Sequence, residues 1–321
     1  MKKIFIAISV FFLLHQNSGA QNIPEAYKTK FTKYRISSKN CTMITHFTGS
    51  QLFIPEKAFL LNDSDNIDSL NLYYKEIRTP LEILVNEIPM TAKISGRDYF
   101  LESNGMFEVW AKSGDDTIAV HEDKSIVVRL ATKPNEVDVR MEGFRFNYDQ
   151  HYWESFTNRL KFSSINKEDD DLWGSSPIEN DVYIEVEGRE WAKKDSIREV
   201  AFQEMEIFDF GFYNYDRILV RETFVSIKAD FTNEKNKKFN DTVYVVYEGI
   251  KSVFYYPPSV WEDGFSVIKN RPYKLFLIDE EGVVYTLKTF PDLEGITTHA
   301  FVLSNDGIAK DRIELANKIG I

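Results

Sequence analysis

Apolar and polar residues alternate along most of the chain. In SLNLYYKE the apolar positions Leu70, Leu72 and Tyr74 alternate with the positions of Asn71, Tyr73 and Lys75. A period of two places successive side chains on opposite faces of a strand, so this segment predicts a strand with one buried face. The same pattern predicts strands at 107–111, 126–130, 137–148, 182–186, 223–227, 242–247, 273–278, 283–287 and 300–303.

Turn-forming residues separate these segments, as at Ser113–Asp116, Glu187–Gly188 and Asp279–Gly282. Many short strands with a turn about every ten residues are typical of sandwiches and barrels, and they argue against alternating strands and helices. The sequence therefore predicts an all-β fold of tandem β-sandwich (Ig-like) domains.

Two segments are also compatible with a helix. DSIREVAFQEMEIF has apolar residues at helical spacing, but Val200, Phe202 and Ile207 also allow a strand, which we favour. The C-terminal segment NDGIAKDRIELANKIGI has Asn305 or Asp306 as an N-cap, an apolar stripe, and Gly320 as a stop signal. We expect a short terminal helix at about residues 306–319.

The length of 321 residues indicates two domains, at about 150 residues each. The most polar stretch, 163–181, contains a run of acidic residues among Ser, Asn, Gly and Pro, and it predicts a loop or linker. The boundary could fall there or near Thr132, where the first set of strands ends, and we favour the earlier point. The predicted domains are an N-terminal sandwich at 40–132 and a C-terminal β-rich domain at 133–321.

The N-terminus has the pattern of a secretory signal peptide over residues 1–20. Lys2 and Lys3 precede an apolar run, and small residues precede a predicted cleavage site between Ala20 and Gln21. The run ends at Leu14, which is short of the roughly 20 residues that a spanning helix needs. We expect an exported mature chain without a transmembrane segment, in the periplasm, on the cell surface or outside the cell.

The composition limits the kinds of partner that the protein can bind and indicates the group of organisms from which it comes. The formal net charge of -11 makes a nucleic-acid partner improbable, because phosphate binding needs a basic surface. The single cysteine, Cys41, allows no internal disulfide. The abundance of Lys, Asn, Ile and Phe is typical of AT-rich bacteria, and together with the signal peptide it indicates the Bacteroidota.

No catalytic, metal or cofactor residues emerge from the motifs. The histidines after the signal peptide lack the spacing of a zinc site, and the acidic segments 62–68 and 168–171 lack the glycine and distal glutamate of a helix-loop-helix calcium site. There is no nucleophile elbow and no phosphate-binding glycine loop. We therefore expect solvated acidic turns, no cofactor and no enzymatic activity.

The aromatic segment FYYPPSVWEDG is the best candidate for ligand binding. Tyr255, Tyr256 and Trp261 lie around Pro257–Pro258, and this step takes the segment out of any central strand. Exposed rings of this kind can stack on a sugar or accept a peptide, whereas the alternative role for large aromatic residues is to fill the core. We predict an aromatic loop that binds a ligand.

Asp-Ser or Asp-Thr followed by an aliphatic residue resembles the O-glycosylation sequon of Bacteroidota. Such a tripeptide is short, and chance supplies some copies. The candidate acceptors are Ser69, Thr117, Ser196 and Thr242.

The order of motifs from Gly49 to Leu130 resembles a known domain. GSQLFIPEKAF is followed by IPM at 88–90, LESNGMFEVWA and SIVVRLATKP. This order resembles secreted Bacteroidota proteins of unknown function, whose N-terminal domain is similar to the β-sandwich domain shared by ankyrins, netrin receptors and zonula occludens proteins. FGFYNYDR resembles a downstream signature of the same group, with Tyr215 where that signature has Cys. The resemblance implies tandem β-sandwiches in an exported, non-enzymatic protein.

Together these features predict a non-catalytic binding or structural module of the bacterial cell envelope, with a protein or glycan partner. The alternative is a carbohydrate-active hydrolase that uses an unidentified pair of carboxylates. A concave, acid-lined cleft would favour the hydrolase, and filled cores with exposed aromatic residues would favour binding.

Overall fold

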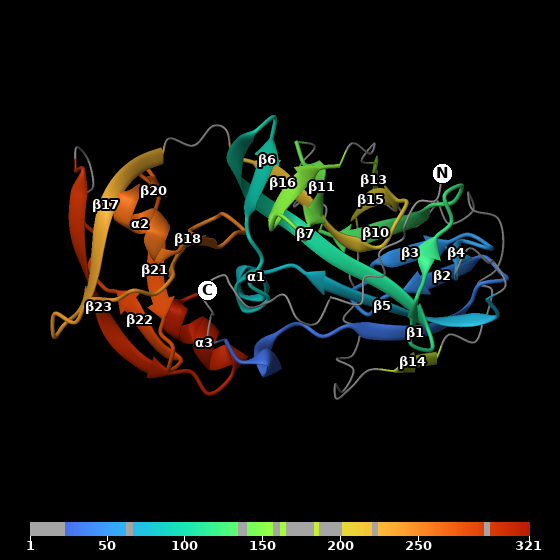
Figure 1. The fold of residues 1–321 in the computed structure, drawn as a ribbon, viewed down its shortest axis with the longest axis horizontal. Helices are drawn as coiled ribbons and strands as arrows, with labels where there is room; N and C mark the ends of the chain where they lie inside the picture. Colours follow the sequence, from blue (N-terminus) through green and yellow to red (C-terminus); the bar gives the residue numbers. More distant parts are fainter. Residues whose placement is uncertain are drawn as a thin grey trace. The chain divides into compact units, whose positions relative to one another are not determined.

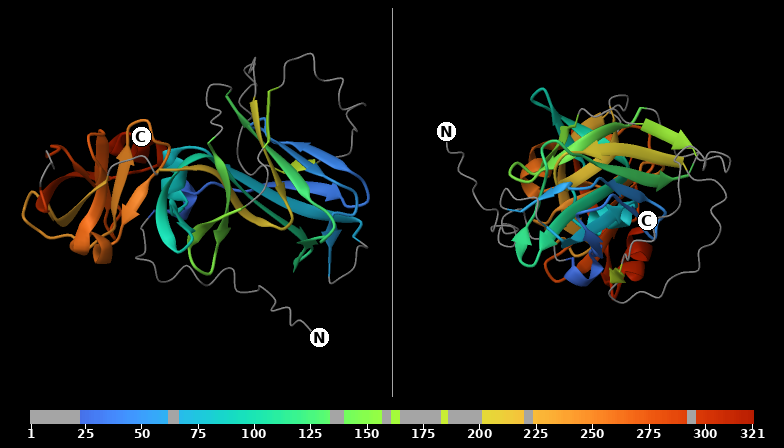
Figure 2. Two further views of the ribbon diagram at one scale, coloured as in Figure 1. Left: turned by 90° about the horizontal axis from the view of Figure 1, so that it is seen from above. Right: turned by 90° about the vertical axis from the view of Figure 1, so that its right-hand side faces the viewer.

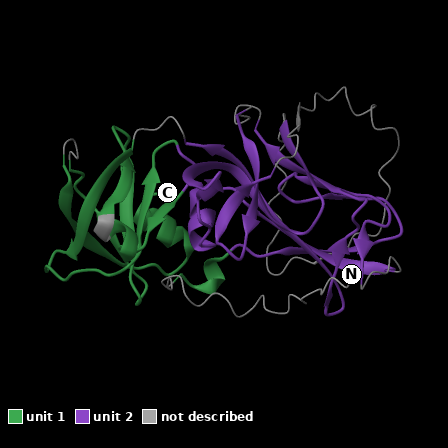
Figure 3. Cartoon of the chain, turned by 45° about the horizontal axis from the view of Figure 1, so that its top comes forward, with its two compact units in different colours: residues 1–28, 221–249, 253–321 green, residues 29–220, 250–252 purple. Residues whose placement is uncertain are grey.

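The computed structural model of the chain is mostly β, which confirms the predicted all-β class (Figure 1). It describes residues 23–61, 67–133, 140–156, 161–164, 183–185, 201–219, 224–291 and 296–321. The chain divides into two compact units (Figure 3). We call residues 29–220 with 250–252 the central unit, and residues 1–28, 221–249 and 253–321 the terminal unit.

The larger sheet of the central unit has nine strands in the order β14-β1-β5-β7-β16-β11-β12-β6, with β8 beside β7. The long strand β7 crosses the unit and pairs with several neighbours, including β6 (Figure 2). Because β6 also pairs with β12, the strands β7, β16, β11, β12 and β6 close into a ring. The bounds are β1 Thr32–Ser37, β5 Ser69–Ile77, β6 Thr91–Ile94, β7 Arg97–Ser113, β8 Asp116–Thr117, β11 Glu142–Asn147, β12 Tyr152–Ser155, β14 Tyr183–Glu185 and β16 Gly211–Ile218.

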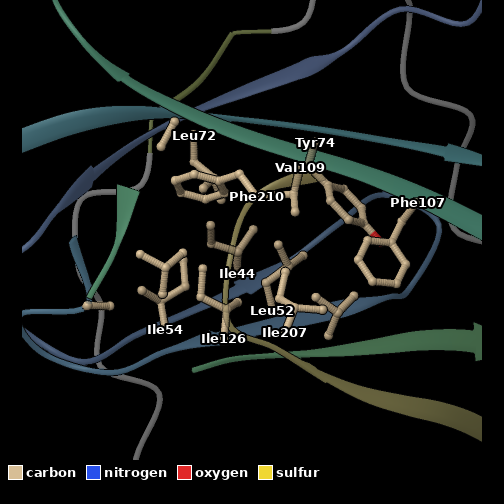
Figure 4. Packing of buried hydrophobic residues seen from close by; sticks show 14 of the residues in the cluster. Ile44, Leu52, Ile54, Leu72, Tyr74, Phe107, Val109, Ile126, Ile207 and Phe210 are labelled. Carbon is tan, nitrogen blue, oxygen red and sulfur yellow. The ribbon is translucent and has the colours of Figure 1, made fainter. Parts of the chain in front are cut away.

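A second sheet of five strands, in the order β13-β15-β10-β3-β2, shares a hydrophobic core with the larger one. Figure 4 shows Leu72 and Val109 of the larger sheet packed together with Ile44 and Leu52 of the second. The alternating apolar positions of the sequence supply this core, as predicted. The bounds are β2 Thr42–Thr45, β3 Gln51–Ile54, β10 Ile126–Thr132, β13 Lys161–Ser164 and β15 Ala201–Ile207; the central unit also contains α1 Pro80–Val85 and the pair β4 Phe59–Leu60 and β9 Ala119–Val120.

The boundary predicted after Thr132 is wrong. Strand β10, which ends there, pairs along its whole length with β15, so Ile126 lies opposite Ile207. Strand β7 likewise pairs with β16. Strands from the region beyond residue 132 thus complete both sheets, and the central unit continues to residue 220. The predicted acidic loop at 163–181 lies mostly outside the described residues.

Two local features of the strands follow from the sequence. β3 ends at Ile54, directly before Pro55, and the chain then turns inward so that Ala58 and Phe59 are fully buried. Proline has no N–H for a ladder, which accounts for the end of the strand. The ambiguous segment before Ile207 forms the strand β15 in its described part.

The terminal unit contains one sheet in the order β19-β18-β21-β22-β23-β17-β20. Its core includes the stacked rings of Phe231 and Phe301, with Phe265 packed edge-on against both. A short 3₁₀ helix at Glu25–Tyr27 belongs to the same unit. The bounds are β17 Phe224–Asn233, β18 Val243–Tyr247, β19 Phe254–Tyr256, α2 Pro258–Gly264, β20 Phe265–Ile268, β21 Tyr273–Ile278, β22 Val283–Leu287, β23 Thr298–Ile308 and α3 Arg312–Ile319.

The terminal helix exists but begins later than predicted. β23 extends to Ile308, so Asn305 and Asp306 are strand residues, and Asp311 caps α3 by accepting a 2.8 Å hydrogen bond from the Glu314 amide. Gly320 ends the helix in the left-handed region, at φ 69°, as predicted. None of the helices in the described ranges is long and apolar enough to cross a membrane.

Candidate functional site

The predicted aromatic loop is in fact part of the core of the terminal unit. Pro257 and Pro258 begin the helix α2, because proline fits the first turn of a helix, where no N–H partner is needed. Tyr256 and Trp261 are only 4% and 3% exposed. The Trp261 ring lies edge-on to Phe231 at 5.1 Å, and Tyr256 donates a 2.7 Å hydrogen bond to the Ser266 carbonyl. The prediction that these two residues stack on a ligand is therefore wrong, and Tyr255 is half-buried beside them.

The other predicted site residues lie in different places. Ser69 and Thr117 are exposed and Thr242 is half-buried, whereas Ser196 and the Ala20–Gln21 cleavage site lie outside the described residues. Glycosylation and cleavage stay predictions. In the part of the chain that the structure describes, no three His, Cys, Asp or Glu side chains are grouped to hold a metal ion.

The side of the larger sheet that faces away from the shared core carries a different set of side chains. Leu72 and Val109 point inward, so strand alternation places their neighbours Tyr73 and Trp110 on the other side. Trp110 is partly buried and also packs against the shared core. Strand register aligns these neighbours in rows across β1, β5, β7 and β16. The rows are Arg35, Asn71 and Lys112; Lys33, Tyr73 and Trp110; and Lys75, Glu108 and Phe212. We call these nine positions the outer face.

Glu108 organises one end of the outer face. Its carboxylate accepts hydrogen bonds from the Trp110 indole at 2.8 Å and the Tyr148 hydroxyl at 3.1 Å, and it pairs with the Lys75 ammonium at 2.7 Å. The side chains of Lys75 and Glu108 are only 15% and 13% exposed, which strengthens these charge-assisted bonds. The carboxylate thus holds the ring of Trp110 in a fixed orientation.

Tyr148 and Phe31 extend this arrangement. Burial, and then the negative charge of Glu108, raise the pKa of Tyr148, so its hydroxyl stays protonated and keeps donating. Its ring lies 6.0 Å from that of Trp110. The Lys75 ammonium lies 4.5 Å from the centre of the Phe31 ring, within cation–π range. The outer face therefore presents rings already held in place by polar groups.

Each polar group at this end of the face is engaged by a neighbour, and the face carries no Ser, Cys or His. Half-buried Tyr73 and Trp110 offer flat apolar rings, while Arg35 and Lys112 are exposed cations. Rings beside polar groups that are already oriented suit recognition of a ligand with both apolar and polar surface.

A buried polar network lies elsewhere in the central unit, around His46. The Tyr34 hydroxyl and His46 Nδ1 are 2.5 Å apart, and burial lowers the pKa of His46 to about 4, although the charge of nearby Glu76 opposes this. Arg78 donates to Glu76 at 2.5 Å, to the Ser50 hydroxyl at 2.8 Å, and to the carbonyl of Ala131. Because Tyr34 and Glu76 belong to one sheet and Ala131 to the other, the network ties the two sheets together.

The FGFYNYDR signature is also buried. Tyr213 and Tyr215 belong to the shared core, and Asn214 and Asp216 are fully buried on the opposite side of β16. Asn214 accepts a hydrogen bond from the Ser103 hydroxyl at 3.0 Å and donates one to Asp216 at 2.5 Å. Burial raises the pKa of Asp216 well above its usual value, which favours the neutral form of this carboxyl. The signature residues from Tyr213 to Asp216 therefore belong to the interior of the central unit.

A small hollow of about 190 Å³ lies in the terminal unit, between the N-terminal segment and α3. Ile23, Val284 and Leu315 contribute apolar surface, and Glu280 and Glu281 lie at its edge. It is smaller than the roughly 300 Å³ at which ligand pockets usually begin. It is therefore not the acid-lined cleft that a hydrolase would need.

Comparisons with known proteins give no relative: no family, no curated protein and no solved structure matches the chain.

Proposed function

We propose that the protein is an exported, non-catalytic binding module of the bacterial envelope that holds a glycan on the outer face of the central unit. The observation that carries the proposal is the pair of half-buried rings, Tyr73 and Trp110, which lie in register on the neighbouring strands β5 and β7. A sugar ring has an apolar side that can lie on such rings, and its hydroxyls can hydrogen-bond to the polar side chains in the adjacent rows.

Export and envelope location rest on the N-terminal sequence pattern. The resemblance to secreted Bacteroidota proteins with an ankyrin- and netrin-receptor-like sandwich supports the same view, and it stays a prediction. Fractionation of the source cells, with the mature N-terminus determined by mass spectrometry, tests this part separately from binding. We expect the mature chain to start at Gln21 and to be absent from the cytoplasm.

Binding is tested with the full mature chain on an array of neutral and acidic polysaccharides, followed by calorimetry on each positive glycan. We expect Tyr73→Ala and Trp110→Ala to weaken binding by at least about tenfold each, because central aromatic residues dominate binding energy. Tyr255→Ala is the matched control, since it removes a half-buried aromatic ring from the terminal unit. It should leave the affinity unchanged.

The proposal fails if no glycan binds, or if Trp110→Ala binds as tightly as the unaltered chain while circular dichroism shows both to be folded. The hydrolase alternative is tested on the same glycans by assaying new reducing ends. The alternative predicts their release, and we expect none.

A further inference from the structure

We infer that the ligand of the outer face is an anionic polysaccharide, one that carries carboxylate or sulfate groups. This inference rests on the proposed glycan-binding function and adds the charge of the ligand. It comes from the distribution of charged side chains over the outer face.

The outer face is basic on an acidic protein. Its nine positions hold four basic residues and one acidic residue, whereas the whole chain has a formal net charge of -11. The single acid, Glu108, is already paired with Lys75, so this pair adds no net charge. The other bases are Lys33, Arg35 and Lys112, of which Lys33 interacts with a neighbouring group. On the neighbouring strand β14, Glu185 lies in register with Lys33 and Tyr183 with Arg35.

Arg35 and Lys112 carry the argument. Both are exposed, and they flank half-buried Asn71 in one row. Their backbones are therefore two strand spacings apart, roughly 10 Å. A chain with repeated anionic groups that crosses the strands can meet both cations while one of its rings lies over Tyr73 and Trp110 in the adjacent row. A neutral glycan would offer these two cations hydroxyl groups but no opposite charge.

Charges near the outer face affect a bound ligand more than the net charge of the whole chain does, because salt screens the distant charges. At physiological salt, charges beyond about 8 Å are largely screened, so a bound ligand responds mainly to Arg35, Lys112 and their neighbours. Rings aligned beside the cations favour a glycan over a simple acidic peptide, because an acidic peptide gains little from flat apolar rings.

The test uses two polyanions with neutral counterparts of the same backbone: polygalacturonate with its methyl ester, and dextran sulfate with dextran. We expect at least one polyanion to bind the full mature chain at least about tenfold more tightly than its counterpart at about 50 mM salt, and to weaken towards 500 mM. Arg35→Glu with Lys112→Glu should remove this preference. The matched control is Lys235→Glu with Lys237→Glu, which makes the same charge change at exposed positions of the terminal unit.

The outcomes separate the two proposals. Equal affinity for charged and neutral forms, unchanged by the Arg35 and Lys112 reversals, overturns the anionic ligand and leaves glycan binding in place. Binding of poly-glutamate as tightly as of both polyanions indicates an acidic protein partner and also overturns it. Failure of all four polysaccharides, together with a blank glycan array, overturns both proposals.

Discussion

Two aromatic residues of the terminal unit, Tyr256 and Trp261, and two of the central unit, Tyr73 and Trp110, differ in their surroundings, although both pairs come from segments rich in aromatic residues. In the terminal unit Tyr256 and Trp261 are buried, and their contacts are other rings and two backbone carbonyls. In the central unit Tyr73 and Trp110 are half-buried on the outer face, where Glu108 fixes the indole. The comparison shows that the burial of an aromatic residue depends on the face of the strand or helix that carries it more than on its neighbours in sequence.

The adjacent pair Tyr73 and Tyr74 makes the same point within one strand. Tyr74 is fully buried and donates a 2.8 Å hydrogen bond to Glu76, whereas Tyr73 lies on the outer face. A prolyl pair such as Pro257–Pro258 indicates a break in a strand, but the break can be a helix that covers the core as well as an open loop.

The largest expected effect is a loss of stability on truncation of Trp261, which is buried in the core of the terminal unit. Trp261→Ala should lower the free energy of unfolding by about 3–5 kcal/mol, because it removes a buried ring and leaves a cavity. Guanidinium unfolding followed by circular dichroism measures the loss. Glycan affinity at the outer face should not change, because Trp261 belongs to the terminal unit.

Trp110→Ala is the matched variant on the other side. It removes the same side chain from a half-buried position, so it should cost much less stability and reduce binding instead. If Trp261→Ala proved no more destabilising than Trp110→Ala, the assignment of one tryptophan to the core and the other to a surface would be wrong.

Acidification should lower the stability of the central unit through His46, which lies in its buried polar network. His46 has a pKa of about 4 in the folded chain and an ordinary value near 6.5 when unfolded. The unfolded chain therefore binds the proton first, and stability is lost as the pH falls from 6.5 towards 4. The expected loss is roughly 2 kcal/mol at about pH 5.

The control for this prediction is His46→Gln, measured at about pH 7.5 and pH 5. The raised pKa of Asp216 acts in the opposite direction, and it contributes equally to both proteins. The unaltered chain should thus lose about 2 kcal/mol more than the variant does. Equal losses would show that His46 does not titrate in this range.

The sequence predicted the strands well because burial on one face leaves a local, periodic trace. The inward positions Leu70, Leu72 and Tyr74 are all buried, as expected. The alternate positions, Asn71, Tyr73 and Lys75, follow from the same period as the opposite face of the strand. What the sequence lacked was the pairing of β5 with β1 and β7, which brings Lys33 and Trp110 beside Tyr73.

The domain boundary could not be predicted for the same physical reason. Pairing between β10 and β15 joins residues about 75 positions apart, such as Arg129 and Glu204, and the polar stretch between them looks like a linker. Strand partners distant in sequence leave no local trace, because alternation reports which face is buried and not which strand lies alongside.

A smaller effect is expected at the helix cap of the terminal unit. Asp311→Ala should cost about 1 kcal/mol, because the Glu314 amide loses its side-chain acceptor. Asp311→Asn keeps an acceptor and should be close to neutral by the same unfolding measurement. A cap variant as damaging as Trp261→Ala would mean that α3, more than the aromatic core, holds the terminal unit together.

The smallest effect is expected for Trp110→Phe, which keeps a ring on the outer face but removes the indole N–H. Glu108 still accepts from Tyr148 and pairs with Lys75, so the loss of stability should be about 0.5–1 kcal/mol. If stacking carries recognition, glycan affinity measured by calorimetry should stay within about threefold of the unaltered chain, far above that of Trp110→Ala. An affinity as low as that of the alanine variant would show that the orientation set by Glu108 matters more than the ring itself. The contrast between Trp110 on the outer face and the buried Trp261 would then rest on the hydrogen bond to Glu108 more than on exposure.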